Sequence, residues 1–167
     1  MFLKNYTSDV PVNQTVHRIE QVLIRCGVSG IMKEYTGVNG EIAALIFQLD
    51  APGGKVSIRI PVDKKKALEA LWLDYADGDK LTADGSAISW NPRKKKRRVD
   101  FADQAERTAW KIMQDWVEVQ MSLIQMKQVD TLQVFLPYVM MNAKENYYEQ
   151  LVASGYRGLL PERTDAG

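Results

Sequence analysis

The chain has 167 residues, of which 46% are hydrophobic and 26% are charged, and its formal net charge is +1. These values are typical of a soluble globular protein about one domain in size, and no apolar stretch approaches the ~20 residues that cross a bilayer. A single cysteine, Cys26, excludes an internal disulfide, and the first nine residues lack the apolar segment of a secretory signal, which favours a reducing compartment.

A first helix is predicted over 13–26. Asn13 is a suitable N-cap, and Gly27 provides a stop signal just beyond the helix. Apolar residues recur at helical spacing and form one stripe, made of Val16, Ile19, Leu23 and Cys26.

Three strands are predicted next, over 30–36, 41–49 and 55–62. Turn signals rich in glycine separate them, and the middle strand is apolar on both faces, as in the centre of a sheet. The third strand alternates, so Lys55, Ser57 and Arg59 share one face while the apolar residues share the other. The pattern indicates a small antiparallel sheet.

A short helix is predicted over 64–76 with Asp63 as its N-cap, followed by a loop or insertion at about 77–98. The strongest element is a long amphipathic helix from about Val99 to Lys127, with a wide apolar face that favours self-association between Phe101 and Met126. On that face Trp116 lies in the main stripe, and Trp110 lies towards the edge.

The C-terminal section is predicted to be helical. Asp130 with Gln133 has the pattern of a capping box, and Asn142 with Glu145 is expected to open a last helix through Ala153. We therefore predict one α+β domain over 1–161, in which the small sheet packs on the N-terminal helix and on the long helix. Residues 162–167 are predicted to be a disordered tail.

Four segments carry a resemblance to a known family: NYTSDVPV (5–12), IMKEY (31–35), AERTAWKIMQDWVEVQMSLI (105–124) and VFLPYV (134–139). They resemble a family of phage- and prophage-encoded proteins of unassigned function. The resemblance implies a small protein in the cytoplasm of a bacterial host, acting in DNA metabolism or against host defence. It is weakest over 77–97, where the relatives have a shorter connection.

Catalytic motifs are missing from the sequence. The only histidine, His17, and the only cysteine, Cys26, are nine residues apart and face different sides of the predicted helix. The glycine pairs at 27–30 and 37–40 have the spacing of turns and not of phosphate-binding loops. We expect no metal, no cofactor and no enzymatic activity.

The predicted sheet offers one candidate binding surface. Lys55 and Arg59 on the third strand, with Lys33 and Tyr35 on the first, are placed on the same face. Cations beside an aromatic ring suit the backbone and bases of single-stranded nucleic acid, although exposed cations on a sheet also serve solubility alone.

The basic run from Arg93 to Arg98 is the second candidate surface. It comprises Arg93, Lys94, Lys95, Lys96, Arg97 and Arg98, and Trp90 just before it could stack on a base. Six cations before a helix oppose its dipole, which suggests a disordered lead-in or a bound anion. Two other interpretations stay open: a nuclear-import type of peptide, and a solvated run balanced by the acidic residues of 74–84.

Three functions follow from these patterns. The first is a non-enzymatic phage-type accessory protein that binds nucleic acid through its phosphates. The second is an anti-defence protein that sequesters a nucleotide messenger or binds a host immune protein. The third is a structural or assembly protein that uses the long helix. None of the three involves a membrane.

Overall fold

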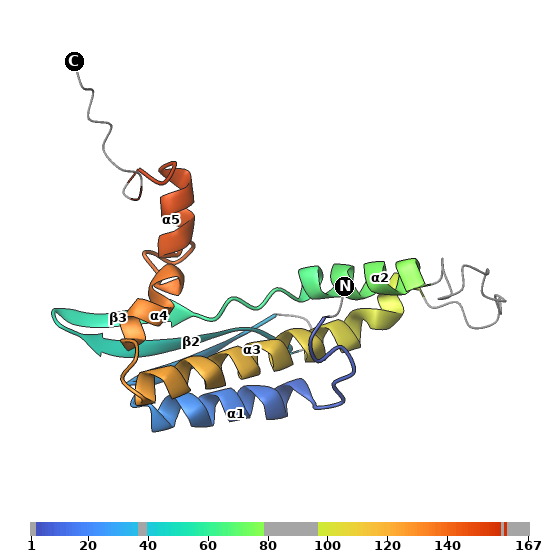
Figure 1. The fold of residues 1–167 in the computed structure, drawn as a ribbon, viewed down its shortest axis with the longest axis horizontal. Coiled ribbons are helices and arrows are strands. Elements are labelled where there is room, and N and C mark those ends of the chain that lie inside the picture. The colour runs from blue at the N-terminus through green and yellow to red at the C-terminus, as the bar shows by residue number, and fades with distance from the viewer. Residues whose placement is uncertain (1–2, 37–39, 79–96, 158, 160–167) are drawn as a thin grey trace, which may run out of the picture. The chain divides into compact units, whose positions relative to one another are not determined.

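The computed structural model describes residues 3–36, 40–78, 97–157 and 159 of the chain. Among these residues it contains five α-helices and one antiparallel sheet with the strand order β1-β2-β3 (Figure 1). The predicted α+β class with a small antiparallel sheet is confirmed. The loop predicted at about 77–98 lies largely outside the described residues, and the tail at 162–167 lies outside them entirely.

The chain divides into two compact units, with boundaries after residues 23, 60 and 119. Unit 1 comprises residues 1–23 and 61–119, and unit 2 comprises residues 24–60 and 120–167. The packing of the sheet on the two helices and the single domain over 1–161 stay predictions.

Helix α1 (Val12–Arg25) belongs to unit 1 over most of its length. Val16, Ile19 and Leu23 are fully buried, as the predicted stripe requires, but Cys26, its fourth member, is only half-buried and lies beyond the last residue of the helix. The helix begins at Val12, so Asn13 lies within it and is not the predicted N-cap. Gly27 adopts a φ of +81° and donates its N–H to the carbonyl of Ile24, so the helix ends where a residue without a Cβ can take a left-handed conformation.

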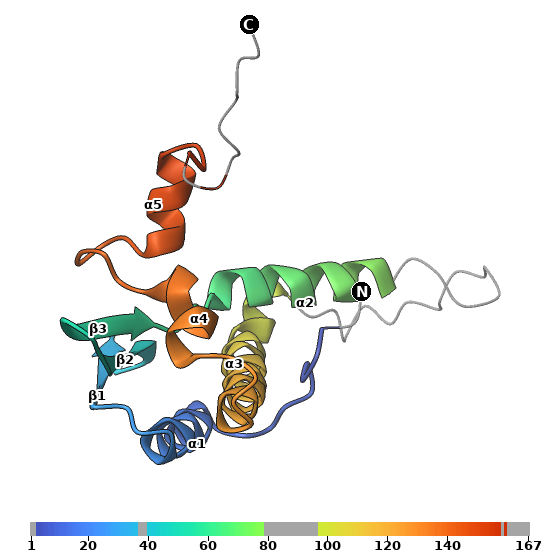
Figure 2. The ribbon, with the colours of Figure 1, turned by 60° about the vertical axis from the view of Figure 1, so that its left-hand side comes forward.

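Helix α2 (Lys64–Gly78) and helix α3 (Ala102–Gln125) are joined by an ion pair between Lys64 and Glu106. Asp63 caps α2 as predicted, because its Oδ1 accepts the N–H groups of Lys65 and Lys66, each at 3.0 Å. The short 3-10 helix η2 (Arg98–Phe101) leads into α3. Helices α1 and α3 lie side by side in both views (Figures 1 and 2).

The position of Trp110 corrects the sequence analysis. Trp110 is fully buried, whereas Trp116, which the periodicity placed in the core, is only half-buried. Thr108 and Gln114 on the same helix are also buried. The buried positions of α3 therefore combine the polar Thr108 and Gln114 with the apolar Ala105, Trp110, Val117 and Met121.

Unit 2 contains strands β1 (Gly30–Tyr35), β2 (Ile42–Ala51) and β3 (Gly54–Arg59). On β2, Ala44 and Ile46 on one face and Leu45 and Phe47 on the other are all buried, which confirms β2 as the central strand with both faces covered. Tyr35 pairs with Ile42 after a register shift that forms a bulge at the end of β1.

A C-terminal section of short helices follows α3 in unit 2. Helix α4 (Thr131–Phe135) begins at the predicted capping box, in which Asp130 Oδ1 accepts the N–H of Leu132 at 2.7 Å. Phe135 packs edge-to-face on Phe47 of β2, with ring centroids 5.2 Å apart. After the 3-10 helix η3 (Leu136–Tyr138), Val139 forms a bridge with Ile58 of β3. The C-terminal section therefore contacts the sheet at Phe47 of β2 and at Ile58 of β3.

The last helix, α5 (Tyr147–Ala153), begins after the predicted position. Asn142 closes a turn instead, because its Oδ1 accepts the N–H groups of Lys144 and Glu145 at 2.8 and 2.9 Å. The capping box of α5 is formed by Asn146 and Glu149, which have the same spacing in the sequence. The predicted start was wrong because the pattern Asn-x-x-Glu occurs twice, at 142–145 and at 146–149, and the helix begins at the second.

Candidate nucleic-acid interface

The basic run enters the described structure at Arg97 and Arg98. The other predicted members of this site, Trp90, Arg93, Lys94, Lys95 and Lys96, lie outside the described residues. Arg98 is exposed at the first position of η2 and forms no ion pair with another described residue, while Arg97 pairs with Asp100, with Nη2 and Oδ1 3.3 Å apart. The end of the run therefore presents at least one cation to solvent.

Asp100 lies where it can offset the unfavourable interaction between the basic run and the helix dipole. Its Oδ2 accepts the backbone N–H of Arg97 at 2.7 Å, which places a carboxylate at the start of the helical segment. A carboxylate there interacts favourably with the positive end of the helix dipole and offsets part of the repulsion from the neighbouring cations. Asp103 adds a second acid in the first turn of α3.

An aromatic cluster anchors η2 to α2. Trp72, Tyr75 and Phe101 are mutually in contact, with ring centroids 5.8 Å apart for Trp72–Tyr75, 6.2 Å for Trp72–Phe101 and 5.2 Å for Tyr75–Phe101. Towards the other end of α2, Lys64 Nζ lies 2.9 Å from Glu106 Oε1 of α3. These contacts hold the end of the basic run beside the C-terminal half of α2, where helix carbonyls favour cations.

The sheet does not assemble the predicted set of cations. Arg59 of β3 forms a salt bridge with Glu34 of β1, with Nη1 2.8 Å from Oε1 and 2.6 Å from Oε2. The pair spans β2 on the face that carries the buried residues Ala44 and Ile46. Lys55 lies 3.9 Å from Asp50. Each predicted phosphate contact on β3 therefore has an acidic neighbour.

Lys33 faces the other side of the sheet, which corrects the prediction that it joins Arg59. Lys33 pairs with Leu45 and Arg59 pairs with Ile46, and these neighbours on β2 point to opposite faces. Tyr35 is 59% exposed but follows the bulge, where regular alternation stops. The predicted face thus loses Lys33, while Lys55 and Arg59 remain on it together, because their partners Asp50 and Ile46 lie on one face of β2.

A polar cluster connects the N-terminal segment to α3 within unit 1. Asp115 Oδ2 lies 2.8 Å from Lys4 Nζ and accepts a hydrogen bond from Asn5 Nδ2 at 3.0 Å, and Asp115 Oδ1 lies 3.4 Å from Lys111 Nζ. The carbonyl of Ser8 accepts hydrogen bonds from Gln104 and Arg107. The segments 5–12 and 105–124, which both carry the resemblance, therefore contact each other. Their polar residues have a structural role in this contact.

Asp115 should make stability depend on pH. Partial burial raises the pKa of Asp115, but the hydrogen bonds from Lys4 and Asn5 and the charge of Lys111 outweigh it, so the pKa is held below its ordinary value. A lowered pKa in the folded state adds stability above the unfolded pKa, which is lost as pH falls through the folded pKa. We expect Asp115→Asn to lower the free energy of unfolding by about 1–3 kcal/mol at pH 7.

Urea unfolding of both proteins between pH 7 and pH 2.5 checks this expectation. The difference between wild type and Asp115→Asn should shrink below about pH 4, where the unfolded carboxyl begins to bind a proton. Asp9→Asn is the matched control, because Asp9 is exposed. A constant difference across the whole range would contradict the role given to the ionised carboxylate.

In the parts of the chain that the structure describes, no three His, Cys, Asp or Glu side chains gather in a group that could hold a metal ion. His17 Nδ1 lies 3.7 Å from Glu20 on the exposed side of α1, and Cys26 accepts a weak hydrogen bond from Gln125 at 3.7 Å. The contact of Trp72 and Tyr75 with Phe101 was not predicted from the sequence, although the i, i+3 spacing of Trp72 and Tyr75 places both on one helix face.

No family model matches the chain, and no curated protein or solved structure shows detectable similarity to it. Of the helices in the described ranges, none combines the length and the apolar character that crossing a bilayer requires.

Proposed function

We propose that this protein binds nucleic acid through backbone phosphates, with Arg93–Arg98 as the main contact. The observation that carries the proposal is the end of the run, where Arg98 is exposed and the following η2 is anchored by Trp72, Tyr75 and Phe101. Clustered cations on an anchored segment release counterions from a phosphate backbone at a small cost in ordering the protein.

The proposal gives the sheet a minor part. Arg59 is paired with Glu34 and Lys55 lies near Asp50, so a phosphate would have to compete with a carboxylate at both positions. The binding would be non-enzymatic and independent of base sequence, because phosphate contacts carry little sequence information. A phage-type accessory role in a bacterial cytoplasm is the setting that the resemblance suggests.

A nucleotide-messenger sponge has less support. Such a protein needs an enclosed pocket lined by several cations. The hollow at the α3–α4 turn has a volume of about 410 Å³, is widely open to solvent, and its lining includes one cation, Lys127, and one acid, Asp130. These features do not suit a compact polyanion.

Salt-dependent binding to a labelled oligonucleotide tests the proposal. We expect a variant with all six residues of Arg93–Arg98 changed to Gln to bind single-stranded DNA at least ~100-fold more weakly at low salt. The slope of log K against log salt should become shallower by up to about 4, since each phosphate contact contributes roughly 0.7 on a single strand. Fluorescence anisotropy between 50 and 300 mM NaCl measures both quantities.

A matched control separates a local effect from a change in total charge. The control variant changes six exposed cations elsewhere to Gln and so lowers the net charge equally: Arg18, Arg25, Lys65, Lys66, Lys127 and Lys144. It should retain most of the affinity and nearly the wild-type slope. If both variants lose the same affinity, or neither loses any, the proposed role of the run is wrong.

A further inference from the structure

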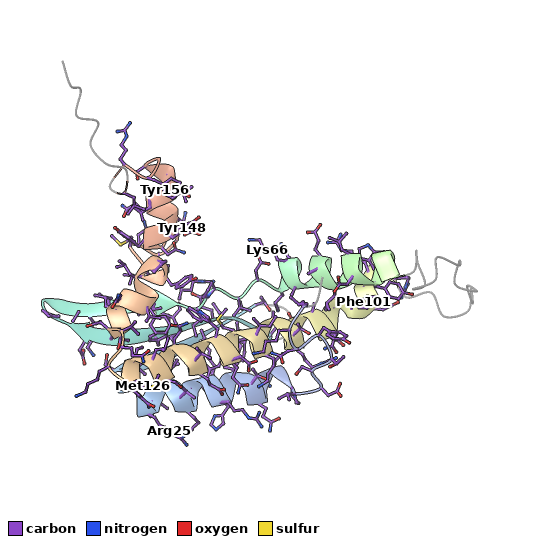
Figure 3. The ribbon with its side chains drawn as sticks, in the orientation of Figure 1. Arg25, Lys66, Phe101, Met126, Tyr148 and Tyr156 are labelled. Carbon is purple, nitrogen blue, oxygen red and sulfur yellow. The ribbon has the colours of Figure 1, made fainter. Side chains whose placement is uncertain are left out.

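Residues 3–8, which we call the N-terminal strap, run across helix α3 within unit 1 (Figures 1 and 3). The crossing lies towards the end of α3 next to Phe101, which Figure 3 labels. The strap forms a turn and no helix or strand, and in this turn Ser8 donates its N–H to the carbonyl of Asn5 at 3.0 Å. Its position therefore depends on contacts with its neighbours.

Polar side chains of α3 bind the backbone of the strap. The carbonyl oxygen of Ser8 accepts hydrogen bonds from Gln104 Nε2 at 3.1 Å and from Arg107 Nε at 3.2 Å. The carbonyl oxygen of Asn5 accepts one from Thr108 Oγ1 at 3.2 Å. Gln104, Arg107 and Thr108 are three and four positions apart, so they share one face of the helix. This face binds both ends of the turn.

Asp115 binds the strap about two turns further along α3. Its Oδ2 lies 2.8 Å from Lys4 Nζ and accepts a hydrogen bond from Asn5 Nδ2 at 3.0 Å. Asn5 has a φ of +61°, a left-handed conformation that asparagine adopts more readily than most residues. In this conformation Asn5 contacts α3 twice, through its side chain at Asp115 and through its carbonyl at Thr108. The contact between Asn5 and Asp115 is therefore central to holding the strap.

Little apolar burial supports these polar contacts. Lys4, Tyr6 and Thr7 are exposed, and Leu3 is only half-buried where it packs against the hydrophobic cluster of α2 and α3. The hydroxyl of Ser8 is buried without a hydrogen-bond partner among the described residues, which costs free energy in the closed strap. A segment with few buried apolar contacts opens at a lower free energy than the core of its domain.

We propose that the N-terminal strap is a detachable element, which opens and closes as a unit while the helices of unit 1 stay folded. The contact between Asn5 and Asp115 sets the equilibrium between the closed and the open strap. Opening removes the strap from Gln104, Arg107 and Thr108, and so changes a covered polar face of α3 into an exposed one. The device is independent of the proposed function, because none of its contacts involves the basic run.

Thiol labelling measures the opening. Ser8→Cys in a Cys26→Ser background places the single thiol where the closed strap buries it. Its reaction with an aromatic disulfide reagent should proceed at a rate that stays nearly constant up to about 1 M urea, since local opening exposes little surface. Asp115→Asn should raise this rate at least ~10-fold, because hydrogen bonds to a charged group are lost. Asp9→Asn removes the same charge from an exposed position beside the strap, and should leave the rate unchanged.

Hydrogen exchange of the wild type gives a second measurement that needs no substitution. The amide of Ser8 should exchange at least ~100-fold faster than that of Ile19, which is fully buried in α1, and only the exchange of Ile19 should accelerate in urea. Neutralising Arg93–Arg98 should change neither measurement, which separates the strap from the proposed function. The proposal is overturned if labelling accelerates with urea in parallel with the exchange of Ile19, or if Asp115→Asn labels no faster than Asp9→Asn.

Discussion

Replacing Phe47 by alanine is expected to lower the free energy of unfolding by about 3–5 kcal/mol. Phe47 is fully buried on the central strand, and its ring meets the equally buried Phe135 edge-to-face, with an interplanar angle of 84°. The truncation removes a large apolar side chain and leaves a cavity that neighbours on a paired β-strand fill poorly. It also removes the aromatic contact that holds α4 to the sheet.

A double-mutant cycle with Phe135→Ala measures that contact. The pair should show a coupling energy of about 0.5–1.5 kcal/mol, because edge-to-face aromatic pairs contribute this much beyond their buried area. Chemical unfolding followed by circular dichroism provides the four free energies. Tyr35→Ala is the control on a neighbouring strand, and since Tyr35 is 59% exposed its replacement should cost less than about 1 kcal/mol. Strictly additive costs for Phe47 and Phe135 would argue against the contact.

Trp110 is expected to show the second large effect. Trp110→Ala should lower the free energy of unfolding of this helical region by about 3–5 kcal/mol, because the indole is fully buried on α3. Trp110→Phe should cost less than half as much. The indole N–H has no hydrogen-bond partner among the described residues, so removing it relieves an unpaired buried donor while most of the ring volume is kept.

The order of the two substitutions is the informative result. Urea unfolding of both variants should place Trp110→Phe between the wild type and Trp110→Ala. Val119→Ala is a control on the same helix, because Val119 is 57% exposed and alanine has the higher helix propensity. If Trp110→Phe were as destabilising as Trp110→Ala, the indole N–H would have to be satisfied by a bound water or another group.

Local signals in the sequence predicted the elements well. Hydrophobic spacing identified the buried stripe of α1 at Val16, Ile19 and Leu23, and the alternation and turn residues identified the three strands. Asp63 and Asp130 were found as caps because a cap requires a short polar side chain at one position. Each of these features depends on residues within a few positions of each other.

Features that depend on distant residues were not predictable in this way. Periodicity placed Trp116 in the core and Trp110 at its edge, but the N-terminal segment docks along α3, where Asn5 contacts Thr108 and Asp115. No local pattern reveals that contact. The face of Lys33 was missed for a similar reason, since alternation gives relative faces within one strand and only the pairing register relates two strands.

The candidate site was predicted in part. The cations of the basic run and of β3 can be identified in the sequence. Their acidic partners were not predicted: Arg97 pairs with Asp100, and Arg59 pairs with Glu34. The spacing of Arg97 and Asp100 could have suggested their pairing. The partnership of Glu34 with Arg59 requires knowledge that β1 and β3 flank the same strand.

The salt bridge between Glu34 and Arg59 also has a consequence for the order of folding. Its two residues lie on strands that never pair with each other, so their charged groups meet only after β2 has accepted both neighbours. An interaction of this kind forms late and contributes little to the folding nucleus. The salt bridge acts on the completed sheet, where it slows the dissociation of an outer strand. It therefore lowers the rate of unfolding more than it raises the rate of folding.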